Sequence, residues 1–162
     1  MSAPITNYTT YNDIRAAIGV TDEELEDATL GLNLYAAYLE TELEEVNIDL
    51  PTTFDTISDL ATPSTAQARF LQACKLFATY AIAKHLTTSL PIFAAKQVSD
   101  GKASMQRFDN PYRDTVAAVN QQYDKTRNRL TQALAAVGTS TAATASLVFV
   151  AVASPSTDPV TG

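Results

Sequence analysis

Side chains that commonly perform chemistry are scarce in this chain. His85 is its only histidine and Cys74 its only cysteine. A single imidazole excludes a metal site built from several histidines, and a Ser-His-Asp arrangement would have to use that one ring. Both residues fall in an Ala-rich helical pattern, where we predict a buried structural thiol at Cys74 and a structural or surface histidine at His85. We therefore predict no catalytic residue and no metal ligand.

Nucleotide-binding motifs are missing as well. The chain contains neither GxGxxG nor GxxxxGK[ST], and residues 101–104 (GKAS) lack the upstream glycine of a phosphate-binding loop. One aromatic and basic group could touch a nucleic-acid backbone: Tyr123, Lys125, Arg127 and Arg129. A net charge of −7 and a pI near 4.5 argue against tight nucleic-acid binding. We predict that the protein is not an enzyme and takes no cofactor.

Charge is divided along the chain. Residues 1–62 carry thirteen acidic side chains against Arg15 alone, whereas residues 63–162 carry ten Lys and Arg against five acidic side chains. The acidic group of interest is Glu40, Glu42, Glu44 and Glu45, and the basic group is Lys125, Arg127 and Arg129. Both groups can be solvated helix faces. The alternative is that copies of the chain stack acidic side against basic side in a ring or filament.

Three helical signals precede the middle of the chain. Thr10, as an N-cap, begins a short helix that Gly19 ends. Thr21, with Glu24 completing a capping box, begins a long amphipathic helix that reaches Val46. This second helix can break near Gly31, and Asp27 would then be a new cap. The first helix is too short to be stable unless it packs on another element.

The next helix is predicted to be the most buried. Residues 47–64 contain two prolines and several Thr and Asp residues, which predict a loop or short turns. Residues 65–89 then place apolar side chains around most of the helix circumference and leave a narrow polar stripe. Such a pattern is typical of the central helix of a bundle.

A break and a last helix follow. Pro91 ends the central helix, and residues 92–108 predict a loop or a small hairpin with Asp100-Gly101 at its turn. Asn110-Pro111 can begin the last helix, and Gly138 is expected to end it. The fold class is therefore mainly α, a bundle of about four helices over residues 1–138.

Beyond Gly138 the composition changes sharply. Residues 139–146 are only Thr, Ala and Ser, and residues 154–162 are rich in Pro, Ser and Thr. Between them lies a β-branched and aromatic run that includes Leu147, Val148, Phe149, Val150 and Val152. We predict an extended arm, residues 139–162, whose strand pairs with another chain. The alternative is a floppy tail.

No membrane segment or secretion signal is expected. The longest strongly apolar stretch, residues 147–153, is far too short to span a bilayer, and the N-terminus lacks a charged region followed by an apolar run. We expect a protein made in a cytoplasm.

The order of these parts resembles the head-tail connector (adaptor) proteins of tailed bacteriophages. The run DIRAAIGVTDEEL, residues 13–25, resembles the opening of that family. The Ala-rich central helix, the break at Pro91 and the segment VSDGKASMQRF, residues 98–108, also resemble it. The resemblance covers residues 10–138, and the long tail beyond Gly138 departs from the smaller members.

The resemblance implies a location and a set of partners. It implies a ring of copies, twelve in number, between the portal protein of the virion and the tail or next neck component. Double-stranded DNA would pass through the ring without being read. The competing hypotheses are a helical binding module, such as a regulatory or DNA-packaging subunit, an enzyme accessory domain, and a different neck or tail-completion ring protein.

Overall fold

The protein is mainly helical. The computed structural model describes residues 3–88, 97–99, 104–106 and 113–152, with side chains described for 3–88 and 113–138. The described elements are the 3-10 helix η1 (Ile5–Asn7), α1 (Tyr11–Ile18), α2 (Asp27–Leu30), α3 (Asn33–Val46), α4 (Leu50–Ser58), α5 (Thr65–Thr87), β1 (Gln97–Ser99), β2 (Ser104–Gln106) and α7 (Arg113–Val152).

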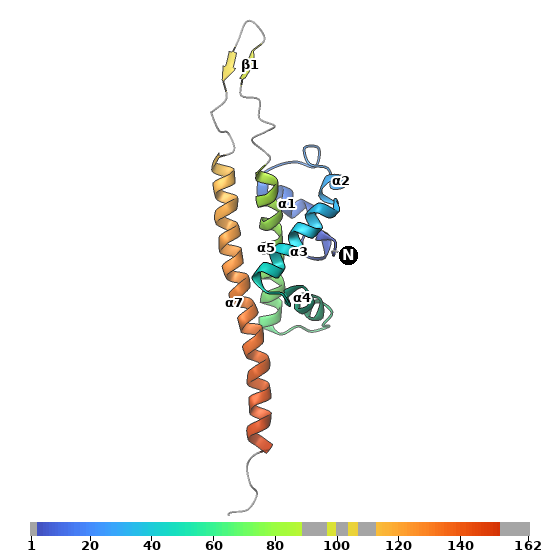
Figure 1. Ribbon diagram of the computed structural model, residues 1–162, viewed down its shortest axis with the longest axis vertical. Helices are drawn as coiled ribbons and strands as arrows, with labels where there is room; N and C mark the ends of the chain where they lie inside the picture. Colours follow the sequence, from blue (N-terminus) through green and yellow to red (C-terminus); the bar gives the residue numbers. More distant parts are fainter. Residues whose placement is uncertain (1–2, 89–96, 100–103, 107–112, 153–162) are drawn as a thin grey trace, which may run out of the picture.

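Helix α5 is the central helix, as predicted. Its first turn is closed by a capping box, in which the Ser64 hydroxyl accepts from the Gln67 N–H and the Gln67 side chain accepts from the Ser64 N–H. Phe70, Phe77 and Ile82 are fully buried along it. In Figure 1, α5 lies between α7 on one side and α1 to α4 on the other, so every other described α-helix is arranged around it.

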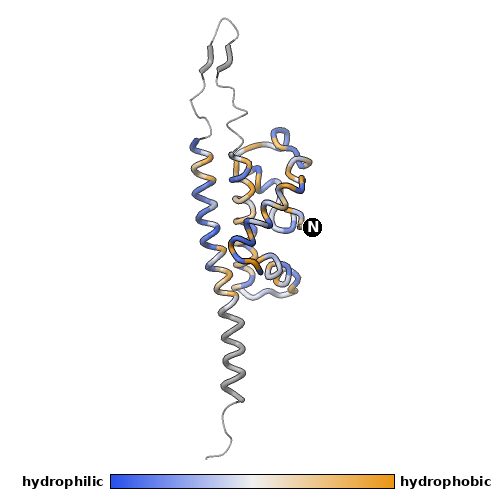
Figure 2. The backbone as a smooth tube through the Cα atoms, in the orientation of Figure 1, coloured by the Kyte–Doolittle hydropathy of each residue, from blue (hydrophilic) through white to orange (hydrophobic). Residues whose placement is uncertain are grey.

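Helix α7 runs antiparallel to α5, and its buried stripe is more continuous than the sequence predicts. Val119, Tyr123 and Leu130 are buried, as expected. The sequence of the last helix predicts an apolar stripe that is interrupted at Thr126 and Arg127. Thr126 is nevertheless buried, and its hydroxyl donates to the Tyr123 carbonyl at 2.9 Å, which satisfies it inside the bundle. In Figure 2 the described part of α7 is mostly blue, hydrophilic, with hydrophobic residues in orange at intervals along it.

Helix α1 has the predicted ends. The Thr10 side chain accepts from the Asp13 N–H at 3.1 Å, and Gly19 adopts the left-handed conformation, with φ +73°, at the C-cap. Ile14 is fully buried and Ile18 nearly so. The short helix is therefore held by packing, which is the condition that the sequence predicted.

The single long helix expected from Thr21 to Val46 is wrong. Residues 21–26 form turns, and α2 is one turn long. The alternative break near Gly31 is confirmed, because Gly31 is the C-cap of α2 and α3 begins at Asn33. Asp27 is the first residue of α2, whose N-cap is Glu26. Half of the predicted capping box is present, because the Thr21 N–H donates to Glu24 at 2.9 Å, yet no helix follows directly. The Leu25 carbonyl instead accepts a hydrogen bond from the Arg15 side chain, which takes the place of a helical partner.

The prediction of a loop or short turns over residues 47–64 is also wrong, because α4 occupies half of this segment. The Asn47 side chain accepts from the Asp49 N–H at 2.8 Å and turns the chain, and Pro51 sits in the first helical turn, where its missing N–H costs nothing. Leu50, Phe54 and Ile57 are buried at spacings of four and three. The bundle therefore has more helices than the four expected, with six α-helices in the described residues.

The hairpin predicted within residues 92–108 is present. β1 and β2 pair antiparallel, with Val98 opposite Met105, while the predicted turn at Asp100-Gly101 lies outside the described residues. The predicted helix start at Asn110-Pro111 also lies outside them. Gly138 does not end α7, whose backbone is helical as far as Val152. Residues 139–152, predicted as part of an extended arm, therefore have a helical backbone in this structure. Strand pairing by residues 147–153 requires a second chain and stays a prediction.

Candidate functional site

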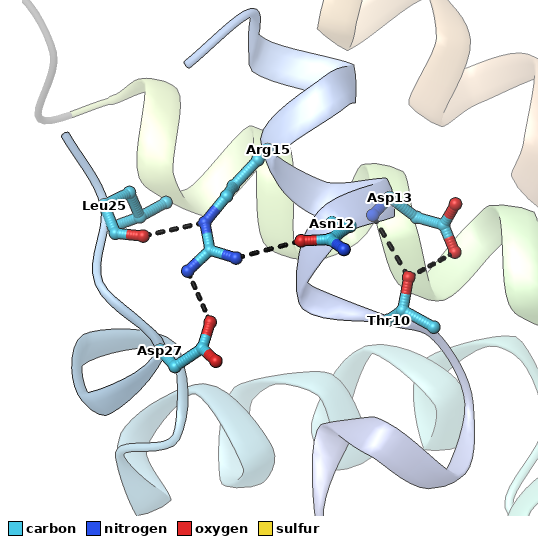
Figure 3. A network of polar contacts seen from close by, with 6 residues as sticks. All are labelled: Thr10, Asn12, Asp13, Arg15, Leu25 and Asp27. Carbon is cyan, nitrogen blue, oxygen red and sulfur yellow. Dashed lines mark hydrogen bonds and ion pairs between the residues drawn. The ribbon is translucent and has the colours of Figure 1, made fainter. Parts of the chain in front are cut away.

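Arg15, the only cation in residues 1–62, is used inside the chain. It is 6% exposed, and its Nε donates to the Leu25 carbonyl at 2.8 Å. One terminal nitrogen donates to the Asn12 side chain at 3.1 Å, and the other pairs with Asp27 at 2.5 Å. Figure 3 shows the guanidinium group joining α1 to the segment that leads into α2. This cation is therefore satisfied internally, and the one carboxylate that it offsets is Asp27.

Most carboxylates of the N-terminal part lack a cation from their own chain. Within the described residues, ion pairs hold only Asp27, bound to Arg15, and Asp13, whose carboxylate lies 2.9 Å from the Lys75 ammonium. The Thr10 hydroxyl and Lys75 lower the pKa of Asp13. The exposed carboxylates of α2, α3, α4 and the turns between them therefore form an acidic surface without counterions from the described part of the chain.

Glu42 does not belong to that surface. It is 9% exposed and accepts hydrogen bonds from two tyrosines, Tyr38 at 2.7 Å and Tyr123 of α7. Burial, followed by the hydrogen bond to Glu42, raises the pKa of both tyrosines. The prediction that Glu42 meets a neighbouring subunit is therefore at odds with its burial, since both of its oxygens are occupied inside the chain.

The remaining acidic residues lie on the outer side of α3. Glu44 and Glu45 are exposed and Glu40 is half-buried. The exposed face that carries Glu44 and Glu45 also carries Leu34, which is 64% exposed, and the exposed Ala37 and Thr41. We call this set, Leu34, Ala37, Thr41, Glu44 and Glu45, the outer α3 face. It combines an apolar end with a doubly acidic end.

The three predicted cations of α7 have different surroundings. Lys125 is exposed, and Arg127 is half-buried close enough to Tyr123 for its charge to oppose the rise in the pKa of that hydroxyl. Arg129 is exposed and lines a groove of about 420 Å³ between α5 and α7. Arg69 of α5 lines the same groove. It belongs to the narrow polar stripe of that helix and was not among the candidate residues predicted from the sequence.

The groove brings together residues from two helices. α5 contributes Ala66, Arg69, Gln72, Ala73 and Leu76, and α7 contributes Arg129, Gln132, Ala133 and Ala136. On each helix these positions recur at spacings of three and four, which place them on one face. The spacing is visible in the sequence, but which face of α5 meets which face of α7 is not. We call this site the α5–α7 groove.

The histidine and the cysteine are integrated into the packing of the bundle. His85 is half-buried, stacked on Tyr38 with ring centroids 4.3 Å apart and edge-on to Tyr35 at 5.8 Å. Cys74 is fully buried, as predicted, and burial raises the pKa of its thiol to about 12. Lys84 lies 3.7 Å above the ring of Tyr123. Within the described side chains, no group of three or more His, Cys, Asp and Glu is arranged to hold a metal ion.

Among the described residues, none of the helices has the length and apolarity needed to cross a membrane. The side chains of Leu147, Val148, Phe149, Val150 and Val152 lie outside the described side chains. Comparison of the chain with protein-family models, with curated proteins and with solved structures found no match.

Proposed function

We propose that the protein is a structural subunit of the neck of a tailed phage. Identical copies would form a ring that joins the portal protein to the tail or the next neck protein, and DNA would pass through its centre. The observation that carries the proposal is the separation of exposed charge. The acidic surface of α2 to α4 lacks counterions in the described part of the chain, while the exposed cations Arg69 and Arg129 line a different surface.

Separated charge favours repeated contacts between identical copies. A contact between two different surfaces of the same chain leaves one surface free at each end, so copies add until the rotation closes a ring. A net charge of −7 also suits a channel for DNA, because it disfavours adhesion to phosphate. The resemblance of residues 10–138 to connector proteins supports the phage neck over other rings.

The mass and symmetry of the purified protein test this proposal. We expect light scattering to give a mass of many copies of the 17.4 kDa chain, and electron microscopy to show rings with a central opening. A monomer at all concentrations, alone and with portal protein, would contradict the proposal. Retardation of duplex DNA at physiological salt would instead favour a DNA-packaging subunit.

The role of residues 139–162 is tested separately. In this proposal the arm binds the portal, a neighbouring copy or the tail by adding a strand. The strand would contain Leu147, Val148, Phe149, Val150 and Val152, and these residues would have to leave the helical conformation that they have in the chain by itself. A chain ending at Gly138 should lose only the helical circular dichroism signal of residues 139–152, keep that of the bundle, and lose attachment to portal or neck particles. Attachment equal to that of the full chain would remove the arm from the proposal.

A further inference from the structure

The α5–α7 groove has the composition of a helix-binding site. Its alanines, Ala66, Ala73 and Ala133 among them, have short side chains that allow a second helix to approach closely, and Leu76 adds apolar surface. Arg69 and Arg129 place one guanidinium group from each helix at the same groove. A matching partner would therefore present small and apolar residues together with carboxylates.

The outer α3 face has that composition. Ala37 and Thr41 are small, Leu34 is the apolar residue, and Glu44 and Glu45 supply two carboxylates. Leu34 and Glu44 are separated by about 15 Å of helix at 1.5 Å per residue. The α5 side of the groove, from Ala66 to Leu76, spans the same about 15 Å by that rise. The two surfaces therefore match in length.

Within one chain these two surfaces do not meet. No residue of α3 lines the groove, and Arg69, Arg129, Glu44 and Glu45 have no ion pair in the part of the chain that the structure describes. The two cations and the two carboxylates lie on separate surfaces, so they can pair when one copy contacts the next. The contact is also heterologous, as a closed ring requires.

We propose that the α5–α7 groove of each copy binds the outer α3 face of the next copy, with Arg69 and Arg129 pairing with Glu44 and Glu45. This inference rests on the proposed function, because the ring supplies the second copy. The sequence had suggested Lys125, Arg127 and Arg129 as partners of the glutamates of α3. The contact proposed here keeps Arg129 and uses Arg69 in place of Lys125 and the half-buried Arg127. It also accounts for the exposure of Leu34, which the neighbour would cover.

Charge reversal with rescue tests the contact. Arg69→Glu with Arg129→Glu in one variant, and Glu44→Lys with Glu45→Lys in another, should each give monomers by light scattering at low salt. Mixing the two should restore full-size assemblies, because reversed groove then meets reversed helix and native groove meets native helix. A chain carrying all four changes should assemble alone. Rings of wild-type mass from either reversed variant by itself would overturn the proposal.

Matched controls separate this contact from a general effect of charge. Lys125→Glu changes an exposed cation of α7 outside the groove, and Asp22→Lys with Glu23→Lys changes two exposed carboxylates outside α3. These variants should assemble like wild type, and monomers from Lys125→Glu would overturn the choice of Arg69 and Arg129. If a reversed variant fails to fold by circular dichroism, the neutral pair Arg69→Gln with Arg129→Gln provides the same comparison.

The outcomes also separate this inference from the proposed function. A wild-type protein that is monomeric under all conditions contradicts both. A wild-type ring that persists in the groove variants contradicts only the contact proposed here and leaves the ring subunit standing.

Discussion

Glu42 is the residue whose surroundings differ most from its sequence context. It lies among exposed glutamates on α3, yet it is buried and joined to Tyr38 and Tyr123. A buried carboxylate is tolerated only when hydrogen bonds replace its lost hydration. The Tyr123 hydroxyl therefore attaches α7 to α3 through a polar contact, while the Tyr38 hydroxyl binds Glu42 within α3.

Removing one of those hydroxyls should destabilise the fold. Tyr123→Phe leaves one carboxylate oxygen of Glu42 without its donor but keeps the ring beneath Lys84 and beside Phe77. We expect a loss of about 1–3 kcal/mol in the free energy of unfolding, measured by urea denaturation. Tyr80→Phe is the control, since its half-buried hydroxyl has no hydrogen bond within the described residues. Equal stability of the two variants would show that Glu42 gains nothing from Tyr123.

The tyrosines also predict a dependence of stability on alkaline pH. Burial raises the pKa of Tyr8 to about 12 and also raises those of Tyr38 and Tyr123. Because the folded-state pKa lies above the unfolded value of about 10, the stabilisation is complete below that pH and is lost as pH rises through the folded values. Ultraviolet titration should show three hydroxyls ionising late, and each Tyr→Phe variant should remove one. Ionisation of all seven tyrosines together near the ordinary value would contradict this prediction.

At the scale of elements, two glycines have opposite roles. Gly19 has φ +73° at the end of α1, a conformation that L side chains rarely adopt. Gly138 lies inside α7, where an added Cβ would meet nothing within 4 Å. A glycine inside a helix lowers its stability because the unfolded chain has more freedom there.

Alanine at each glycine should therefore change stability in opposite directions. We expect Gly19→Ala to destabilise the protein by about 1 kcal/mol and Gly138→Ala to stabilise it by up to about 1 kcal/mol. Thermal unfolding followed by circular dichroism measures both. Destabilisation by Gly138→Ala would mean that α7 ends there, as the sequence first indicated.

At the scale of the whole molecule, the separation of charge should make assembly sensitive to salt. Screening shortens the reach of charge from about 10 Å at 0.1 M salt to about 3 Å at 1 M. We expect light scattering to show the assembly dissociating over this range while the helical spectrum of each copy persists, since the core of the bundle is apolar. An assembly that grows with added salt would instead indicate apolar contacts between copies.

Local signals were sufficient for three elements. Thr10 and Gly19 delimit α1 because a side-chain cap and a left-handed glycine act within one turn. The sequence of α5 predicts a central helix because it places apolar side chains on most sides, and these must be buried. The hairpin at residues 97–106 was one of two alternatives, and its strands pair in the structure.

Other features depended on partners distant in the sequence. The Leu25 carbonyl accepts a hydrogen bond from Arg15 at a point where a long helix was predicted. The buried Glu42 carboxylate accepts a hydrogen bond from Tyr123, which lies 81 residues further along the chain. The sequence by itself determined that the protein is helical and that its charge is divided. Only the tertiary structure decided which carboxylates remain exposed and that Arg69 and Arg129 share one groove, because both depend on how α3, α5 and α7 pack.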